Sequence, residues 1–267
     1  IMQEYINTDR KLHRLSQIIA KVNRSLLHGQ KDDSHTNLYF DAVDKRIIGR
    51  WVDSPAGQII LSLNLFSQAF EWLDKKQKIL NNLAIHDTDL SALEKNISKY
   101  PASLNMNTEK IFEPLHFDIP EYEIEGLSNL KFSVEGLNSW VYFRKLANLA
   151  CQNFLGFLQA ESEVRIWPHH FDTGIYTLIT DNLSMGFGLA MEDPMIDQPY
   201  FYISGYNEKN PLSYQNLKSL SRGRWETGKN WNGAVLPLGD ISASSFTKAE
   251  DTSNTFIKET TAWFLNQ

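Results

Sequence analysis

The stretch 138–159 constrains the fold more than any other part of the chain, because large apolar side chains recur in it every three or four positions. These residues are Trp140, Phe143, Ala147, Ala150, Phe154 and Phe157. The spacing predicts a long helix with one broad apolar face. Such a face must be buried against another layer of structure, which the rest of the chain has to supply.

Further stretches show helical spacing. Residues 8–28 carry apolar side chains three and four positions apart, and Gly29 is placed to end that helix. A second helix is predicted from Phe66 to Leu80, with Phe70 and Leu73 on the same stripe. A short helix is predicted near 90–97, and a last one at 255–265.

Short apolar runs bounded by turn residues predict strands in both halves of the chain. In the first half they form an antiparallel meander with turns at 44–45 and 53–57. The expected strands are 38–40, 47–52 and 58–63, then 164–167, 174–180, 184–190, 200–205 and 233–236.

These elements predict an α+β fold, with an antiparallel or mixed sheet of about six to eight strands packed by three to four long helices. The order helix, three strands, helix occurs about twice, which is typical of a pseudo-duplicated chain. We expect residues 1–267 to form a single domain. Its internal halves would be 1–86 and 136–267, joined by a loose connection at 87–135.

Composition excludes some classes of function. A net charge of −6 and a pI near 5.7 disfavour the extended basic surface of a nucleic-acid-binding protein. No apolar stretch is long enough to span a membrane, and the first residues lack the pattern of a secretory signal, so we expect a cytoplasmic protein. The single cysteine, Cys151, lies among apolar helical residues and is expected to be buried.

Two imidazoles and a carboxylate are concentrated in the segment 165–172. If the segment is extended, a period of two places His170 and Asp172 on one side, with His169 and Phe171 on the other. Asp172 would then orient His170 as a general base, or both would ligate a divalent metal. A metal needs a third ligand, for which His169, Glu192, Asp193 and Asp197 are nearest in sequence. The alternative is a structural hydrogen-bond network.

Two segments beyond the histidines carry further candidates. Gly186 and Gly188 lack the third glycine and the following helix of a dinucleotide loop, so no nucleotide cofactor motif is present. The acidic loop after them would bring Glu192 toward a shared ligand-binding site. Tyr200 and Tyr202 would form an aromatic wall of this site. Trp167 and His169 are the ligand-binding candidates from the histidine segment itself.

The pattern Leu-His-x3-Gln-Ile-x2-Lys-Val at 12–22 and the pattern Trp-x3-Phe-Asp at 167–172 resemble a bacterial family catalogued as a conserved domain of unknown function. The resemblance implies that the chain is one unit, and it implies no reaction, cofactor or partner. His13 and Gln17 share a helix face, so they would line the site beneath Asp172. The alternative is a polar pair that bridges the helix to a loop or to solvent.

Two functions remain open on this basis. The first is a small-molecule site, enzymatic or not, around the His-His-Phe-Asp segment, with a divalent metal as the cofactor considered. The second is a non-catalytic protein-interaction module or oligomeric scaffold. The sequence decides neither the reaction, the substrate nor whether the protein forms a homo-oligomer.

Overall fold

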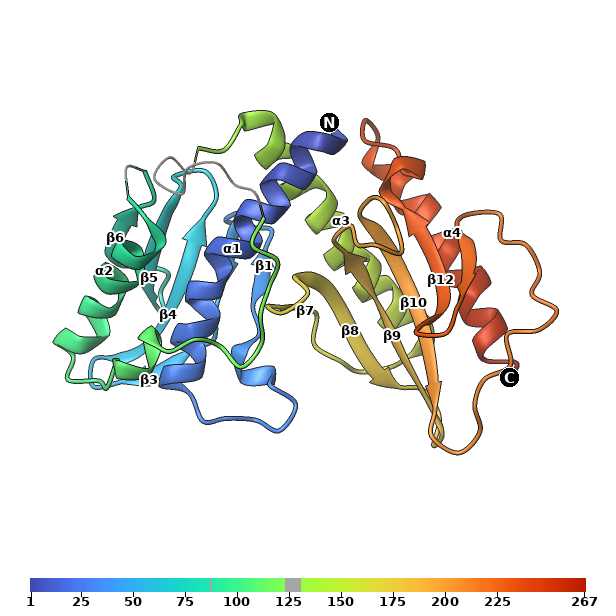
Figure 1. Cartoon of the computed structure of the whole chain (residues 1–267), viewed down its shortest axis with the longest axis horizontal. Helices are drawn as coiled ribbons and strands as arrows, with labels where there is room; N and C mark the ends of the chain where they lie inside the picture. The colour runs from blue at the N-terminus through green and yellow to red at the C-terminus, as the bar shows by residue number, and fades with distance from the viewer. Residues whose placement is uncertain (87, 123–130) are drawn as a thin grey trace. The chain divides into compact units, whose positions relative to one another are not determined.

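Four α-helices and two antiparallel sheets of six strands each are present in the computed structural model, which describes residues 1–86, 88–122 and 131–267. This confirms the α+β fold, although the strands form two sheets (Figure 1). Residue 87 and residues 123–130 of the expected connection lie outside the described residues.

Each half of the chain runs helix, six strands, helix, so the order of elements repeats, but with six strands per half where the sequence predicted three. The first half consists of α1 (Met2–Leu26), β1 (Tyr39–Asp41), β2 (Arg46–Ile48), β3 (Val52–Ser54), β4 (Gly57–Asn64), β5 (Ala69–Asp74), β6 (Ile79–Ala84) and α2 (Leu90–Ser103). The second consists of α3 (Val134–Leu158), β7 (Arg165–Trp167), β8 (Asp172–Leu178), β9 (Leu183–Ala190), β10 (Tyr200–Asn207), β11 (Arg224–Thr227), β12 (Asn232–Pro237) and α4 (Phe246–Phe264). The first sheet has the order β1-β2-β4-β5-β6, with β3 paired to β4, and the second has the order β11-β12-β10-β9-β8-β7.

The described chain divides into two compact units whose borders differ from the expected halves. Unit 1 comprises Ile1, Gln3–Val141 and Ile166–Phe171, and unit 2 comprises Met2, Tyr142–Arg165 and Asp172–Gln267. The chain therefore passes between the units within α3, within β7 and after Phe171.

In unit 1, α1 lies across one face of the first sheet (Figure 1). Gly49 permits this close approach, because a Cβ there would lie 2.7 Å from Asn23 Oδ1 and 2.8 Å from Ile19 Cγ2. Asn23 is itself buried, where it donates to the Asn37 carbonyl and accepts from the Arg50 amide. Trp72 on β5 donates its indole N–H to the Ile97 carbonyl and so ties α2 to the same sheet.

A polar network is buried on the other face of the first sheet. Glu71 on β5 is 2% exposed and accepts a hydrogen bond of 3.0 Å from the Arg46 guanidinium on β2. The amides of Asn64 and Asn82 donate to the same carboxylate at 3.4 and 3.5 Å. The network thus joins four strands, and the ion pair is desolvated.

In unit 2, one face of the second sheet packs against α3 and α4. Phe187 on β9 stacks on Phe154 of α3, with ring centroids 5.1 Å apart. The Phe264 ring of α4 occupies the place of a side chain above Gly205 on β10, 2.7 Å from where a Cβ would stand. Cys151 is buried under this layer as expected, and burial raises the pKa of its thiol.

The prediction of a helix from Phe66 to Leu80 is wrong, because this stretch forms β5 and β6. Phe66 lies in the turn before β5, where Asn64 Oδ1 accepts the amides of Phe66 and Ser67. Asp74 makes the next turn by accepting the amides of Lys76 and Lys78. A stripe of apolar residues three and four apart fits a helix, but β5 is buried on both faces and so lacks the alternation that marks a strand.

The other helices are confirmed with shifted ends. The predicted helix at 255–265 begins at Phe246, because Ser245 caps it by accepting the Lys248 amide. Asp89 caps α2 in the same way through the Ala92 amide. Among the described residues, no helix is long and apolar enough to cross a membrane.

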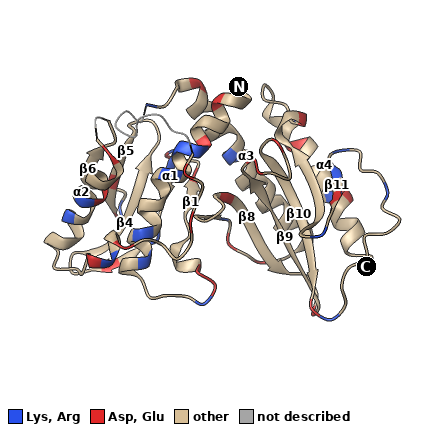
Figure 2. Cartoon of the chain, in the orientation of Figure 1, with Lys and Arg blue, Asp and Glu red and all other residues tan. Residues whose placement is uncertain are grey.

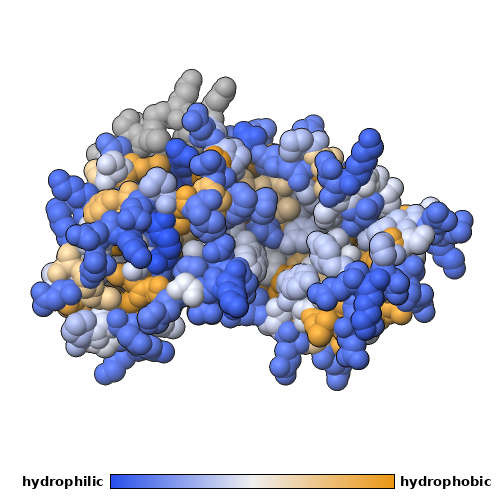
Figure 3. All heavy atoms as spheres, turned by 60° about the horizontal axis from the view of Figure 1, so that its bottom comes forward, coloured by the Kyte–Doolittle hydropathy of each residue, from blue (hydrophilic) through white to orange (hydrophobic). Residues whose placement is uncertain are grey.

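Charged and apolar residues are both dispersed over the surface. Figure 2 shows Lys and Arg interspersed with Asp and Glu along the chain. On the face drawn in Figure 3, hydrophobic residues emerge as separate small patches among hydrophilic ones.

Candidate functional site

The His-His-Phe-Asp segment is a turn between β7 and β8. The Phe171 amide donates to the Trp167 carbonyl at 2.6 Å, and Phe171 has a left-handed φ of 55°. His169 and His170 in this turn are exposed, and Trp167 is half-buried. The alternation that would place His170 and Asp172 on one side does not run through a turn. His170 belongs to unit 1 and Asp172 to unit 2.

His13 and Gln17 hold this turn in unit 1. Both His13 Nε2 and Gln17 Nε2 lie within hydrogen-bond distance of the Pro168 carbonyl, at 2.9 and 2.8 Å. Because a carbonyl only accepts, His13 Nε2 carries a proton, and Nδ1 shares a hydrogen bond of 2.6 Å with the Tyr122 hydroxyl. The buried His13 ring also stacks on Phe171 at 5.1 Å. This arrangement matches the alternative of a polar pair that bridges α1 to a loop.

The tripeptide His-Phe-Asp occurs at 116–118 as well as at 170–172, and its first copy lies beside the histidine turn in unit 1. The Phe117 ring of the first copy contacts the His169 ring at 4.7 Å, and His169 stacks on His170 of the second copy at 4.3 Å. His116 is paired with Asp33 at 2.8 Å, with both side chains exposed. Within the described residues, however, no group of three or more His, Cys, Asp and Glu could hold a metal ion.

Asp172 is engaged by a tyrosine in unit 2. The Tyr202 hydroxyl on β10 donates to Asp172 Oδ2 at 2.5 Å. Burial, and then the charge of Asp172, raise the pKa of Tyr202 well above its usual value, so the phenol remains a donor. The sequence predicted both residues as site residues, and the structure brings them together across the sheet.

Gly174 and Gly188 make this bond geometrically feasible. They are direct partners on β8 and β9, and Gly188 is in turn the partner of Tyr202. A Cβ at Gly174 or Gly188 would lie 2.7 or 2.9 Å from the Tyr202 hydroxyl. The glycines therefore form a bare strip against which the Tyr202 hydroxyl lies as it reaches across to Asp172. Gly188, which belongs to no dinucleotide loop, thus has a packing role.

Tyr200 makes a second tyrosine–carboxylate pair, with Asp193. Its hydroxyl donates to Asp193 Oδ2 at 2.6 Å, and Asp193 Oδ1 accepts the amides of Met195 and Ile196. Burial raises the pKa of Tyr200, and the Asp193 bond raises it further. Asp193 thus shapes its own loop, while Glu192 beside it is half-buried and Asp197 is exposed.

Two buried charged residues are absent from the predicted site. Asp9 on α1 accepts the Trp140 indole N–H at 2.7 Å in unit 1. Arg144 on α3 donates to the Thr173 hydroxyl at 2.8 Å in unit 2. Both side chains are fully buried. Their burial could have been predicted from the sequence, since each residue falls on the apolar stripe of its helix.

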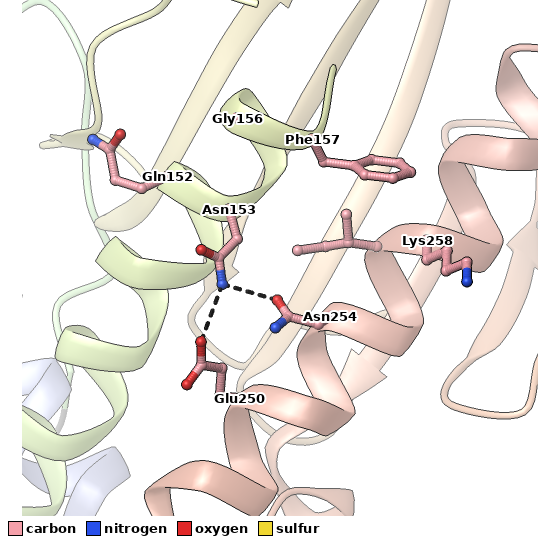
Figure 4. Close-up of a pocket in the computed structure, with 8 residues that line it drawn as sticks. Gln152, Asn153, Gly156, Phe157, Glu250, Asn254 and Lys258 are labelled. Carbon is pink, nitrogen blue, oxygen red and sulfur yellow. Dashed lines mark hydrogen bonds between the residues drawn. The ribbon is translucent and has the colours of Figure 1, made fainter. Parts of the chain in front are cut away.

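A cleft between α3 and α4 in unit 2 was also missed. We call it the α3–α4 cleft; it has a volume of about 480 Å³ and is lined by Gln152, Asn153, Gly156, Phe157, Glu250, Asn254, Ile257 and Lys258 (Figure 4). Asn153 Nδ2 donates to Asn254 Oδ1 at 2.9 Å and to Glu250 Oε1 at 3.5 Å. Phe157 is 55% exposed. At Gly156 an added Cβ would meet open space.

A smaller depression of about 350 Å³ lies along the other side of α4. It is lined by Arg222, Asp240, Ser242, Lys248, Asp251, Thr252 and Thr255. Its two cations and two carboxylates are surface residues of opposite sign, so their charges offset one another.

Comparisons with known proteins add no homologue. No family model, curated protein or solved structure matches the chain. The resemblance to a bacterial family of unknown function therefore stays a prediction, as do the roles of His170 and Asp172.

Proposed function

We propose that this protein binds a small molecule and that the α3–α4 cleft is the binding site. The cleft carries the proposal, because it joins an apolar wall to polar groups from two helices within a volume typical of ligand sites. Of the two groups expected to do chemistry, Asp172 has a structural partner, and so has the binding candidate His13. Asp172 accepts from Tyr202, and both ring nitrogens of His13 are engaged.

The test is a thermal-shift screen of the full chain against metabolites and nucleotides. A ligand at about one hundred times its Kd stabilises the folded state by about 2.7 kcal/mol and raises Tm. We expect hits whose shift disappears in Gly156→Leu, which fills the cleft, and persists in Gly156→Ala. His170→Ala should leave the shift unchanged. Hits that survive Gly156→Leu and vanish in His170→Ala would overturn the proposal in favour of the histidine segment.

Self-association is a second candidate, favoured by an apolar patch at one end of the second sheet. Tyr176, Leu178 and Tyr206 are 56%, 61% and 48% exposed, and the two tyrosine rings lie 5.9 Å apart. Contiguous exposed apolar side chains often mark an interface. If two copies associate here, light scattering should report a dimer that Tyr206→Lys dissociates. A monomer at all concentrations would remove this candidate.

A further inference from the structure

The polar groups of the α3–α4 cleft are arranged along its length. Glu250, Asn254 and Lys258 follow one another at successive turns of α4, so a carboxylate, an amide and an ammonium group start from one stripe of the helix that lines the cleft. At about 1.5 Å of rise per residue, roughly 12 Å of helix axis separates Glu250 from Lys258. The side of the cleft contributed by α3 adds the exposed Phe157 ring and the open space above Gly156.

The hydrogen bonds already present leave specific groups for a ligand. Asn153 uses both of its amide hydrogens, on Asn254 Oδ1 and Glu250 Oε1. Within the described part of the chain, no hydrogen bond or ion pair engages the Asn254 amide nitrogen or the Lys258 ammonium. The cleft therefore offers an anion at one end, an amide donor in the middle and a cation at the other end.

We propose that the ligand of this cleft is a short extended peptide of about three residues with free termini. Its amino terminus would bind Glu250, its carboxylate Lys258, and a peptide carbonyl the Asn254 amide. Three extended residues span about 10 Å, which matches the line of groups once the length of the Lys258 side chain is included. An apolar central side chain would pack on Phe157. This inference rests on the proposed binding function and specifies its ligand.

The experiment titrates the full-length protein with the tripeptide Ala-Leu-Ala, its N-acetylated form and its C-amidated form, monitored by two-dimensional NMR. We expect saturable shifts of Gly156 and Asn254 amides with the free tripeptide. Each blocked form should bind about threefold to tenfold more weakly, because each loses one ion pair in a partly solvated cleft. Equal affinity for the three forms, or no saturation at about 10 mM, would overturn the peptide assignment.

Single-residue variants test which side chain of the cleft binds each end of the peptide. Glu250→Gln should weaken binding of the free tripeptide and leave binding of the acetylated form unchanged. Lys258→Gln should weaken binding of the free tripeptide and leave binding of the amidated form unchanged. Asp251→Asn and Lys248→Gln, on the other side of α4, are the matched controls and should change nothing. If metabolite hits are lost in Gly156→Leu while no tripeptide binds, the binding function stands and the peptide inference fails.

Discussion

Tyr202 combines two roles that depend on different parts of its side chain. Its ring extends from β10 toward Asp172, and its hydroxyl lies against Gly174 and Gly188 and donates to Asp172 on β8. The packing is tightest at Gly188, where a Cβ would also lie 2.4 Å from the Thr173 carbonyl oxygen. Tyr202, Asp172 and the two glycines thus pack together as one structural unit.

Tyr202→Phe should keep the ring and remove the hydrogen bond to a carboxylate. We expect the free energy of unfolding to fall by about 1.5–3 kcal/mol, the usual cost for a bond to a charged group. Urea denaturation at neutral pH measures the change. Tyr206→Phe, on the exposed end of the same strand, is the control and should change stability by less than about 0.5 kcal/mol. Equal effects would contradict the role given to the Tyr202 hydroxyl.

Tyr214 makes stability depend on alkaline pH. Burial raises the pKa of Tyr214 to about 12 from 10, so folding favours the neutral phenol. Its contribution is complete below pH 10 and is lost as the pH rises to about 12, because the unfolded chain releases the proton first. In the Tyr214→Phe variant, the free energy of unfolding should fall less steeply between pH 10 and 12. The difference between the slopes of the two proteins should reach about 1.4 kcal/mol per pH unit. Urea unfolding at pH 9–12 tests this, and parallel curves would contradict it.

Among the elements, strands buried on both faces are the ones that sequence periodicity describes worst. α1 and α3 could be predicted because apolar residues occupy one face of each. In β5, by contrast, Phe70, Glu71 and Trp72 are all buried, so no alternation is visible. β11 was missed because Arg224–Thr227 has no apolar run, and its pairing with β12 defines it as a strand.

Substitutions at two glycines should change the free energy of unfolding in opposite directions, because their surroundings differ in how tightly they are packed. Gly49→Ala should lower the free energy of unfolding by about 1–3 kcal/mol, because the methyl group collides with Asn23 and Ile19 of α1. Gly156→Ala should raise it by about 0.4–1 kcal/mol, because the helix gains a better former and the methyl group meets open space. Chemical denaturation of both variants provides the comparison. Destabilisation by Gly156→Ala would show that the cleft is filled.

Substitutions in the Glu71 network measure how much the buried ion pair between Glu71 and Arg46 contributes to stability. Glu71→Ala should cost about 3–5 kcal/mol, because the Arg46 guanidinium remains desolvated without its main partner. The double variant with Arg46→Met should recover much of this loss. Denaturation of the two single variants and the double variant gives the coupling energy. Additive losses would mean that the two side chains do not act as a pair.

At the scale of the whole molecule, the candidate site could be predicted only in part. Tyr202 and Asp172 were both identified, but their contact links positions far apart in sequence. Asn153 and Asn254 are even farther apart and appear as ordinary polar residues on the outer faces of two helices. Nothing in a single sequence indicates that two such faces enclose a cleft.

Phe171 is where unit 1 depends on a distant part of the chain. It is fully buried against His13 and Trp140, with ring centroids 5.1 and 6.2 Å apart. Phe171→Ala should destabilise unit 1 by about 3–5 kcal/mol. Hydrogen exchange of the α1 amides should accelerate accordingly, whereas the exposed Phe157→Ala should leave it unchanged. Unchanged exchange in Phe171→Ala would contradict this dependence.

The membership of Ile166–Phe171 in unit 1 has a consequence during synthesis. When the ribosome has made the chain as far as Val141, the nascent chain still lacks the partner of Leu38 at Ile166 and the carbonyl that His13 and Gln17 bind at Pro168. Completion of unit 1 must therefore wait until about thirty more residues have left the exit tunnel, which at about 5–20 residues per second is a delay of seconds.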